Sequence, residues 1–109
     1  TSMDSVAAFF DEKIASKLRD DPDSAMQIGE IFQFVISGDG GGTWTVDLKN
    51  GPTLTAEAND DATCILKVTD EDFLALINGE VSGMELFGTG RLTVERDVMA
   101  AMKLEKLIK

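Results

Sequence analysis

The chain has 109 residues, a length that fits one domain, and 43% of them are hydrophobic, which excludes an intrinsically disordered protein. Acidic residues outnumber basic ones 20 to 10, and a net charge of −10 argues against a general nucleic-acid binder, which needs a positive surface. No apolar run approaches the ~20 residues that span a bilayer, and no signal-peptide pattern precedes the first expected helix.

The N-terminal third is expected to contain two helices and a central strand. Residues 3–19 repeat apolar side chains every four positions, which is typical of an amphipathic helix: Val6, Phe10, Ile14 and Leu18. Asp21 is expected to cap a second, short helix that begins at Pro22. Residues 30–37 are apolar on both faces of an extended chain, so we expect a strand in the middle of its sheet.

The middle of the chain is expected to form three more strands. The glycine-rich segment 39–42 predicts a hairpin rather than a phosphate-binding loop, because no Lys-Ser/Thr pair and no helix follow it. Residues 43–49 alternate between apolar and polar, and Asn50-Gly51 predicts a tight hairpin. Residues 54–58 predict a weak edge strand, and residues 62–68 a fourth strand.

The last third is expected to contain two helices, a fifth strand and a closing helix. Thr69 is expected to cap a helix that ends at Gly79, and Ser82 to cap a shorter one. A strand follows around residues 92–94, and Asp97 is expected to cap the closing helix. The whole pattern indicates an α+β fold: a five-stranded, mostly antiparallel sheet with helices mainly on one face.

The closing helix carries more apolar surface than one packing face needs. One stripe is formed by five residues: Ala100, Ala101, Leu104, Leu107 and Ile108. Val98, Met99 and Met102 lie off that stripe. Two interpretations stay open: a helix wedged between the sheet and a neighbouring element, or a helix that packs on the protein with one side and on a ligand or membrane with the other.

Charge is distributed unevenly along the chain. Residues 1–90 hold 5 basic and 17 acidic residues, whereas residues 91–109 hold 5 basic and 3 acidic ones. The lysines near the end of the closing helix suit the negative end of its dipole. The alternative is a basic face that meets anionic lipid or an acidic partner.

The sequence offers no catalytic centre. It contains no histidine, which removes Ser-His and Cys-His dyads and the commonest metal ligand. Its single cysteine, Cys64, is expected to be a buried, unreactive thiol. The acidic residues at 60–61 and 70–72 lack the spacing of an EF-hand loop, so a turn and a helix N-terminus explain them better than calcium does. We expect no enzyme activity, cofactor or metal.

Four segments, in order, resemble the sterol carrier protein type 2 family. Residues 42–51, GTWTVDLKNG, resemble its G-x-W-x-hydrophobic-D-L-K-x-G hairpin. Residues 62–73, ATCILKVTDEDF, look like its segment ending in S/T-D-E-D-F, and residues 86–94 include a similar F-x-x-G-K/R-L stretch. Residues 97–104, DVMAAMKL, resemble its D/N-x-M-x-A-x-K-L helix, although Arg96 stands where the family commonly has glycine.

This resemblance implies a hydrophobic tunnel that binds and transfers fatty acids, fatty acyl-coenzyme A, sterols or similar lipids with broad selectivity and without catalysis. It places nine residues at the ligand, each of which is equally suited to the core: Trp44, Phe73, Ile77, Met84, Phe87, Leu92, Met99, Met102 and Leu104. The alternative function is a protein–protein, interdomain or dimerisation module that uses the apolar face of the closing helix.

The expected partner is therefore a lipid, and not a nucleic acid. A transient membrane contact and a homodimer or partner enzyme stay open. Residues 3–109 are expected to form a single sterol-carrier-type lipid-binding domain, with Thr1-Ser2 a remnant of cloning. The terminal Leu107-Ile108-Lys109 does not match the peroxisomal address of many family members, so we expect a cytoplasmic location.

Overall fold

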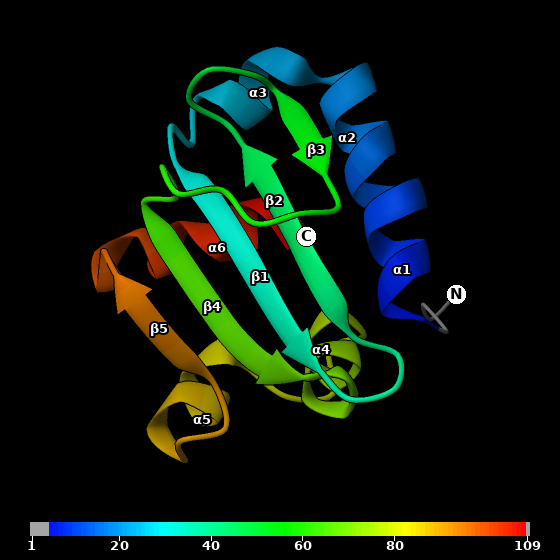
Figure 1. Ribbon diagram of the computed structural model, residues 1–109, viewed down its shortest axis with the longest axis vertical. Helices are drawn as coiled ribbons and strands as arrows, with labels where there is room; N and C mark the ends of the chain where they lie inside the picture. The colour runs from blue at the N-terminus through cyan, green and yellow to red at the C-terminus, as the bar shows by residue number, and fades with distance from the viewer. Residues whose placement is uncertain (1–4, 109) are drawn as a thin grey trace.

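The fold is built on one five-stranded sheet, seen in a computed structural model that describes residues 5–108 (Figure 1). Its strands run in the order β3-β2-β1-β4-β5. Their bounds are β1 (Ile31–Ser37), β2 (Gly42–Asp47), β3 (Thr53–Thr55), β4 (Cys64–Thr69) and β5 (Thr93–Arg96). Only the β1–β4 pair is parallel, and the three other pairs are antiparallel. The prediction of a mostly antiparallel, five-stranded sheet is confirmed.

The helices lie mainly on one face of this sheet (Figure 1). The N-terminal helix runs without a break through α1 (Val6–Ala8), the π-helical η1 (Phe9–Ile14) and α2 (Ala15–Asp20). It is followed by α3 (Pro22–Met26), and later in the chain by α4 (Asp70–Ile77) and α5 (Gly83–Gly88). The chain then closes with η2 (Val98–Lys103) and α6 (Leu104–Ile108). Figure 1 shows α6, in red, crossing behind the central strands.

The central strand β1 separates a large core from a small one. Phe32, Phe34 and Ile36 point into the main cluster on the helical side. Ile31, on the other face, packs with Val35, Ala62 and Ile65 in a small cluster. β1 lies between β2 and β4, which agrees with the expectation that a strand apolar on both faces is central in its sheet.

Aromatic side chains bind the N-terminal helix to the sheet. Phe10 stacks on Trp44 and on Phe73, with ring centroids 4.6 and 5.7 Å away, and meets Phe34 edge-on at 5.1 Å. Phe9 and Phe10 are both fully buried, and the wider π-helical turn accommodates these two consecutive rings. Ring pairs at these distances contribute beyond the area that they bury.

The predicted helix caps are confirmed. In each case the side-chain oxygen of the cap accepts a hydrogen bond from the backbone N–H three residues later: Ser24 to Asp21 at 3.4 Å, Asp72 to Thr69 at 3.2 Å, Glu85 to Ser82 at 3.1 Å and Ala100 to Asp97 at 3.2 Å. These bonds satisfy donors that a helix start otherwise leaves free, so the boundaries are encoded locally.

Three expectations differ from the structure. Asn50-Gly51 does not form a tight hairpin, because Asp47 pairs with Thr53 across a longer loop. The Asp47 carboxylate accepts hydrogen bonds from the backbone N–H of Lys49 and Asn50, which turns the chain earlier. The edge strand β3 ends at Thr55 rather than continuing to residue 58.

The closing helix is the third difference, since it begins with six residues of 3₁₀ helix before α6. Val98, Met99 and Met102 in η2 are exposed, so packing supports this segment from one side only. Most helical stability in proteins comes from such packing, and 3₁₀ hydrogen bonds are weaker than α-helical ones.

Candidate functional site

The nine residues predicted at the ligand divide into a buried set and an exposed set. Four belong to the main core: Trp44, Phe73, Leu92 and Leu104. Ile77 is partly buried and packs against the same cluster. Trp44 and Phe73 come together through Phe10, which stacks on both rings. The structure therefore places these five in the packed main core or against it.

The other four predicted residues are exposed on the surface. Met84 and Phe87 on α5 expose 79% and 47% of their surface, and Met99 and Met102 on η2 each expose 69%. Together with Val98, they are the exposed large hydrophobic residues of the part of the chain that the structure describes. They lie on two segments, α5 and η2, which β5 separates along the chain.

The closing helix has two apolar sides, as its sequence predicts. Ala100, Leu104, Leu107 and Ile108 are buried against the main core. The sides of η2 that carry Met99 and Met102 face away from it. This is the geometry expected of a helix that covers the core with one side and meets something outside the domain with the other.

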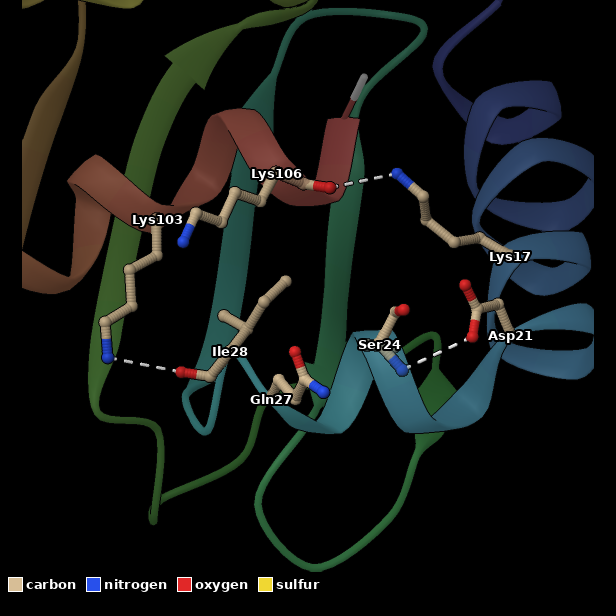
Figure 2. A pocket seen from close by; sticks show the side chains of 8 residues that line it. Lys17, Asp21, Ser24, Gln27, Ile28, Lys103 and Lys106 are labelled. Atoms are coloured by element: carbon tan, nitrogen blue, oxygen red, sulfur yellow. Dashed lines mark hydrogen bonds between the residues drawn. The ribbon is translucent and has the colours of Figure 1, made fainter.

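A cleft of about 360 Å³ lies where the closing helix passes α2 and α3 (Figure 2). Its wall contains none of the nine predicted residues. It is lined by Lys17, Asp21, Ser24, Ala25, Gln27, Ile28, Lys103 and Lys106. These residues come from both ends of the chain, so their spacing in sequence does not reveal the cleft. The basic composition of residues 91–109 was the one signal that pointed to part of it.

Two lysines hold the ends of the closing helix on either side of the cleft. The Lys17 ammonium donates to the carbonyl oxygens of Lys106 and Leu107, at 3.0 and 2.7 Å. The Lys103 ammonium donates to the carbonyl of Ile28 at 3.2 Å and to the Glu30 carboxylate at 2.9 Å. Lys17 thus supplies donors to the final carbonyls of a helix, which its own turns leave without partners.

Two of these groups, Lys17 and Glu30, have shifted pKa values. Burial lowers the pKa of Lys17, and the nearby charge of Lys13 acts in the same direction. Burial acts to raise the pKa of Glu30, but hydrogen bonds from Lys103 and Thr63 outweigh it and hold that pKa below its usual value. Glu30 is therefore ionised at neutral pH and balances the charge of Lys103.

Cys64 is not a nucleophile in this structure. The thiol is fully buried on β4, and burial, followed by the charges of Asp97 and Glu30, raises its pKa to about 11. Since the thiolate is the reactive form, this thiol stays protonated and inert at neutral pH. Within residues 5–108, no group of three or more cysteine, aspartate and glutamate side chains is arranged to hold a metal ion.

Arg96, the departure from the family pattern, has a backbone conformation that favours glycine. Its φ angle is +68°, in the left-handed region. The guanidinium donates to the carbonyls of Asp60 and Ala62, at 2.9 and 2.6 Å. These two hydrogen bonds are available to arginine and not to glycine, and they offset the strained backbone.

The chain belongs to the SCP-2 sterol transfer family, whose model matches residues 10–109. It is 34% identical over 97 residues to human hydroxysteroid dehydrogenase-like protein 2. The aligned residues make up 87% of this chain and 23% of the relative. The chain therefore spans less than a quarter of that relative's length. The family resemblance seen in the sequence motifs is confirmed.

Solved structures share the fold. Sterol carrier protein 2 from Yarrowia lipolytica, in its apo form, superposes with a TM-score of 0.78 at 25% identity, covering 99% of this chain and 94% of that one. Sterol carrier protein 2 from Aedes aegypti, solved with palmitate, gives a TM-score of 0.67 at 28% identity, covering 88% of this chain and 87% of that one. None of the helices within residues 5–108 is long and apolar enough to cross a membrane.

Proposed function

We propose that this chain binds lipids non-covalently and transfers them, without catalysing a reaction on them. Membership of the SCP-2 sterol transfer family and the palmitate complex of the Aedes aegypti relative support this proposal. The observation that carries it in this chain is the two-sided closing helix, which buries Leu104 and exposes Met99 and Met102. We further propose that residues 3–109 act as a single lipid-binding domain.

The proposed site lies between the closing helix and the sheet, where a lipid would insert among the apolar side chains of the main core. Trp44, Phe73 and Leu104 would contact the deeper part of an acyl chain, while Met99 and Met102 would contact it near the surface. Methionine adapts to apolar surfaces of irregular shape, which suits ligands of different length. The hydrogen bonds of a 3₁₀ segment are weaker than those of an α-helix. Within the closing helix, η2 is therefore the part that moves away from the core at the lowest free-energy cost.

The energetics favour broad selectivity. Burying ~14 methylenes at ~0.8 kcal/mol each contributes on the order of 11 kcal/mol of favourable binding free energy, before the cost of association is subtracted. Loss of rigid-body freedom, of at least ~4 kcal/mol, leaves an affinity near the micromolar range without any polar contact. Fatty acids, acyl-coenzyme A and sterols are all candidates on this basis.

The test is direct detection of bound lipid. We expect lipid in organic extracts of the purified protein and in its native mass spectrum. Palmitate should also change the emission of Trp44, because that ring stacks on Phe10 beside the proposed site. Finding no lipid in repeated preparations, together with unchanged Trp44 emission, would rule the proposal out.

A matched pair of variants locates the site. Replacing both Met99 and Met102 with Gln should weaken palmitate binding several-fold, because apolar contact area is lost. Val98→Gln on the same 3₁₀ segment is the control, since Val98 is 46% exposed and is not among the proposed contacts. Equal weakening by the control would show a general effect on η2 rather than contact with ligand.

The alternative is an interaction module that uses the same exposed side chains. Exposure of 69% at both Met99 and Met102 is the observation that favours it. A homodimer, or contact with an enzyme domain in a longer protein, would cover them. Association that increases with protein concentration, measured by light scattering, would support this alternative. Replacing Met99 and Met102 together with Lys should then abolish the association and leave the affinity for palmitate unaltered.

Two further parts of the proposal come from composition. The net charge of −10 argues against a nucleic-acid partner, and the membrane contact that we propose is a transient one. The cytoplasmic location stays a prediction from the sequence.

A further inference from the structure

The 3₁₀ segment η2 is attached to the core by little apolar surface. Among its six residues, Ala100 is buried, and Ala101 packs against the main core from a partly buried position. The three larger apolar side chains are exposed: Val98, Met99 and Met102. Because alanine methyl groups are small, apolar packing contributes little to holding η2 in place. The position of η2 therefore depends on polar contacts at its two ends.

Both ends of η2 are linked to Thr63, which directly precedes β4. At the N-terminal end, the backbone N–H of Asp97 donates to the carbonyl oxygen of Thr63 at 3.0 Å. At the C-terminal end, the Lys103 ammonium donates to one oxygen of the Glu30 carboxylate at 2.9 Å. The Thr63 hydroxyl donates to the other oxygen of that carboxylate, also at 2.9 Å. We call these four residues the latch, because together they connect the start of η2 to its end.

The latch is fixed to the sheet on one side and to the closing helix on the other. The Thr63 hydroxyl accepts a hydrogen bond from the backbone N–H of Ile31 at 2.9 Å. Glu30 directly precedes β1, so its carboxylate lies on the sheet side. Lys103 belongs to η2 and makes a second hydrogen bond, to the carbonyl of Ile28 at 3.2 Å (Figure 2). If η2 moves away from the core, the contact between Glu30 and Lys103 must break.

This contact is sheltered on its acidic side. The Glu30 side chain is 13% exposed, whereas that of Lys103 is 47% exposed. A hydrogen bond between two charged groups is stronger than a neutral one, and salt screens a partly buried pair less than an exposed one. The pair therefore contributes to holding η2 against β4 and β5, where apolar packing contributes little.

We propose that Glu30 is a positioning residue that latches η2 over the core and thereby sets how fast lipid enters and leaves. The inference rests on the proposed lipid function and names the contact that regulates access to that site. Glu30 acts through Lys103 and is not among the proposed lipid contacts, so the latch holds the free and the loaded protein equally. Weakening it should raise the rates of entry and release by the same factor and leave the affinity unchanged.

The test measures palmitate association and release in Glu30→Gln and in Lys103→Met. Both rates should be about threefold to tenfold higher in each variant than in the wild type, with little change in the dissociation constant. Because the two residues act through one contact, the double variant should be no faster than the faster single variant. A weaker affinity with an unchanged association rate would mean that Glu30 contacts the ligand, and would overturn the inference.

Lys67→Met is the matched control for Lys103→Met. The Lys67 side chain is 48% exposed, almost the same as Lys103, and it pairs with Glu95 on the sheet rather than with Glu30. The substitution removes the same charge and breaks an ion pair of similar kind. It should leave both palmitate rates unchanged, and equal acceleration by this control would overturn the inference.

Amide hydrogen exchange provides a measurement that needs no lipid. In Glu30→Gln, exchange should become faster in residues 98–103 and stay unchanged in β2. Unchanged exchange in η2, or a uniform increase in all elements, would overturn the inference whether or not lipid binds. Faster exchange in η2 with unchanged palmitate rates would also overturn it, while lipid binding itself would stand. If palmitate does not bind the wild type, the lipid proposal fails, and faster exchange confined to η2 would still support the latch.

Discussion

Arg96 shows how a single residue can depart from a family pattern without loss of the fold. Its left-handed backbone favours glycine, but its side chain bridges the carbonyls of Asp60 and Ala62. Two opposing contributions therefore meet at one position. The backbone disfavours a side chain, and the guanidinium stabilises the turn that precedes β4.

Two substitutions separate these contributions. Arg96→Ala and Arg96→Gly both remove the guanidinium hydrogen bonds, but only alanine keeps a Cβ at a φ of +68°. We expect Arg96→Gly to be the more stable of the two by about 1 kcal/mol. Urea unfolding of both variants and the wild type measures this difference. Equal midpoints for the two variants would show that the backbone at this position is not strained.

Cys64 gives a second prediction, in the alkaline range. The folded protein raises the thiol pKa from 9.0 to about 11, so it holds the proton more tightly than the unfolded chain does. The protonated thiol therefore contributes to the free energy of unfolding. This contribution is complete below pH 9 and is lost as pH rises toward 11. Across the whole shift, the free energy of unfolding falls by about 2 to 3 kcal/mol.

The measurement is the free energy of unfolding against pH for the wild type and for Cys64→Ala. The variant should lose less stability between these pH values than the wild type, whatever its absolute stability. Parallel curves would show that burial of the thiol does not shift its titration.

At the scale of elements, the sequence predicts the parts whose signals are local. The caps Asp21, Thr69, Ser82 and Asp97 act within three residues, and all four form as expected. Strand β1 is predictable as central because both of its faces are apolar. The tight turn at Asn50-Gly51 fails because the Asp47 carboxylate competes for the backbone donors of the same loop.

The cleft was beyond prediction for a different reason. Lys17 and Lys106 meet only after the sheet and helices have brought both ends of the chain together, and no periodicity records such contacts. The sequence does predict Met99 and Met102 as a second apolar side of the closing helix. The 3₁₀ conformation of η2 is not predictable in this way, because it depends on how little of that segment packs against the rest of the protein.

The closing helix depends on Lys17 for its final turn, which gives a prediction at this scale. Lys17→Met keeps an unbranched apolar stem but removes the donors to the carbonyls of Lys106 and Leu107. We expect a loss of about 1 kcal/mol in stability and faster amide exchange in α6. Lys13→Met is the control on the same helix, because that ammonium lies 5.8 Å over the ring of Phe9 rather than at α6. Equal exchange rates in α6 for both variants would contradict the capping role.

At the scale of the whole molecule, charge and apolar surface act on membrane encounters in opposite directions. The net charge of −10 repels an anionic bilayer over a Debye length of about 10 Å at moderate salt. Met99 and Met102 lie on the same closing segment as Lys103 and Lys106, near the C-terminal end of the chain. An approach led by that end would reduce the repulsion, whereas any other orientation would not.

The salt dependence of lipid transfer to vesicles distinguishes an encounter dominated by the overall charge from one led by the C-terminal end of the chain. If the overall charge dominates, moving a fluorescent fatty acid from the protein to vesicles that contain phosphatidylserine should become faster as salt is added, because screening removes repulsion. Transfer to neutral phosphatidylcholine vesicles is the control and should change little. A rate that falls with salt for the anionic vesicles alone would mean that the basic end leads the encounter. Lys106 would then face the membrane, and Lys106→Gln should weaken that salt dependence.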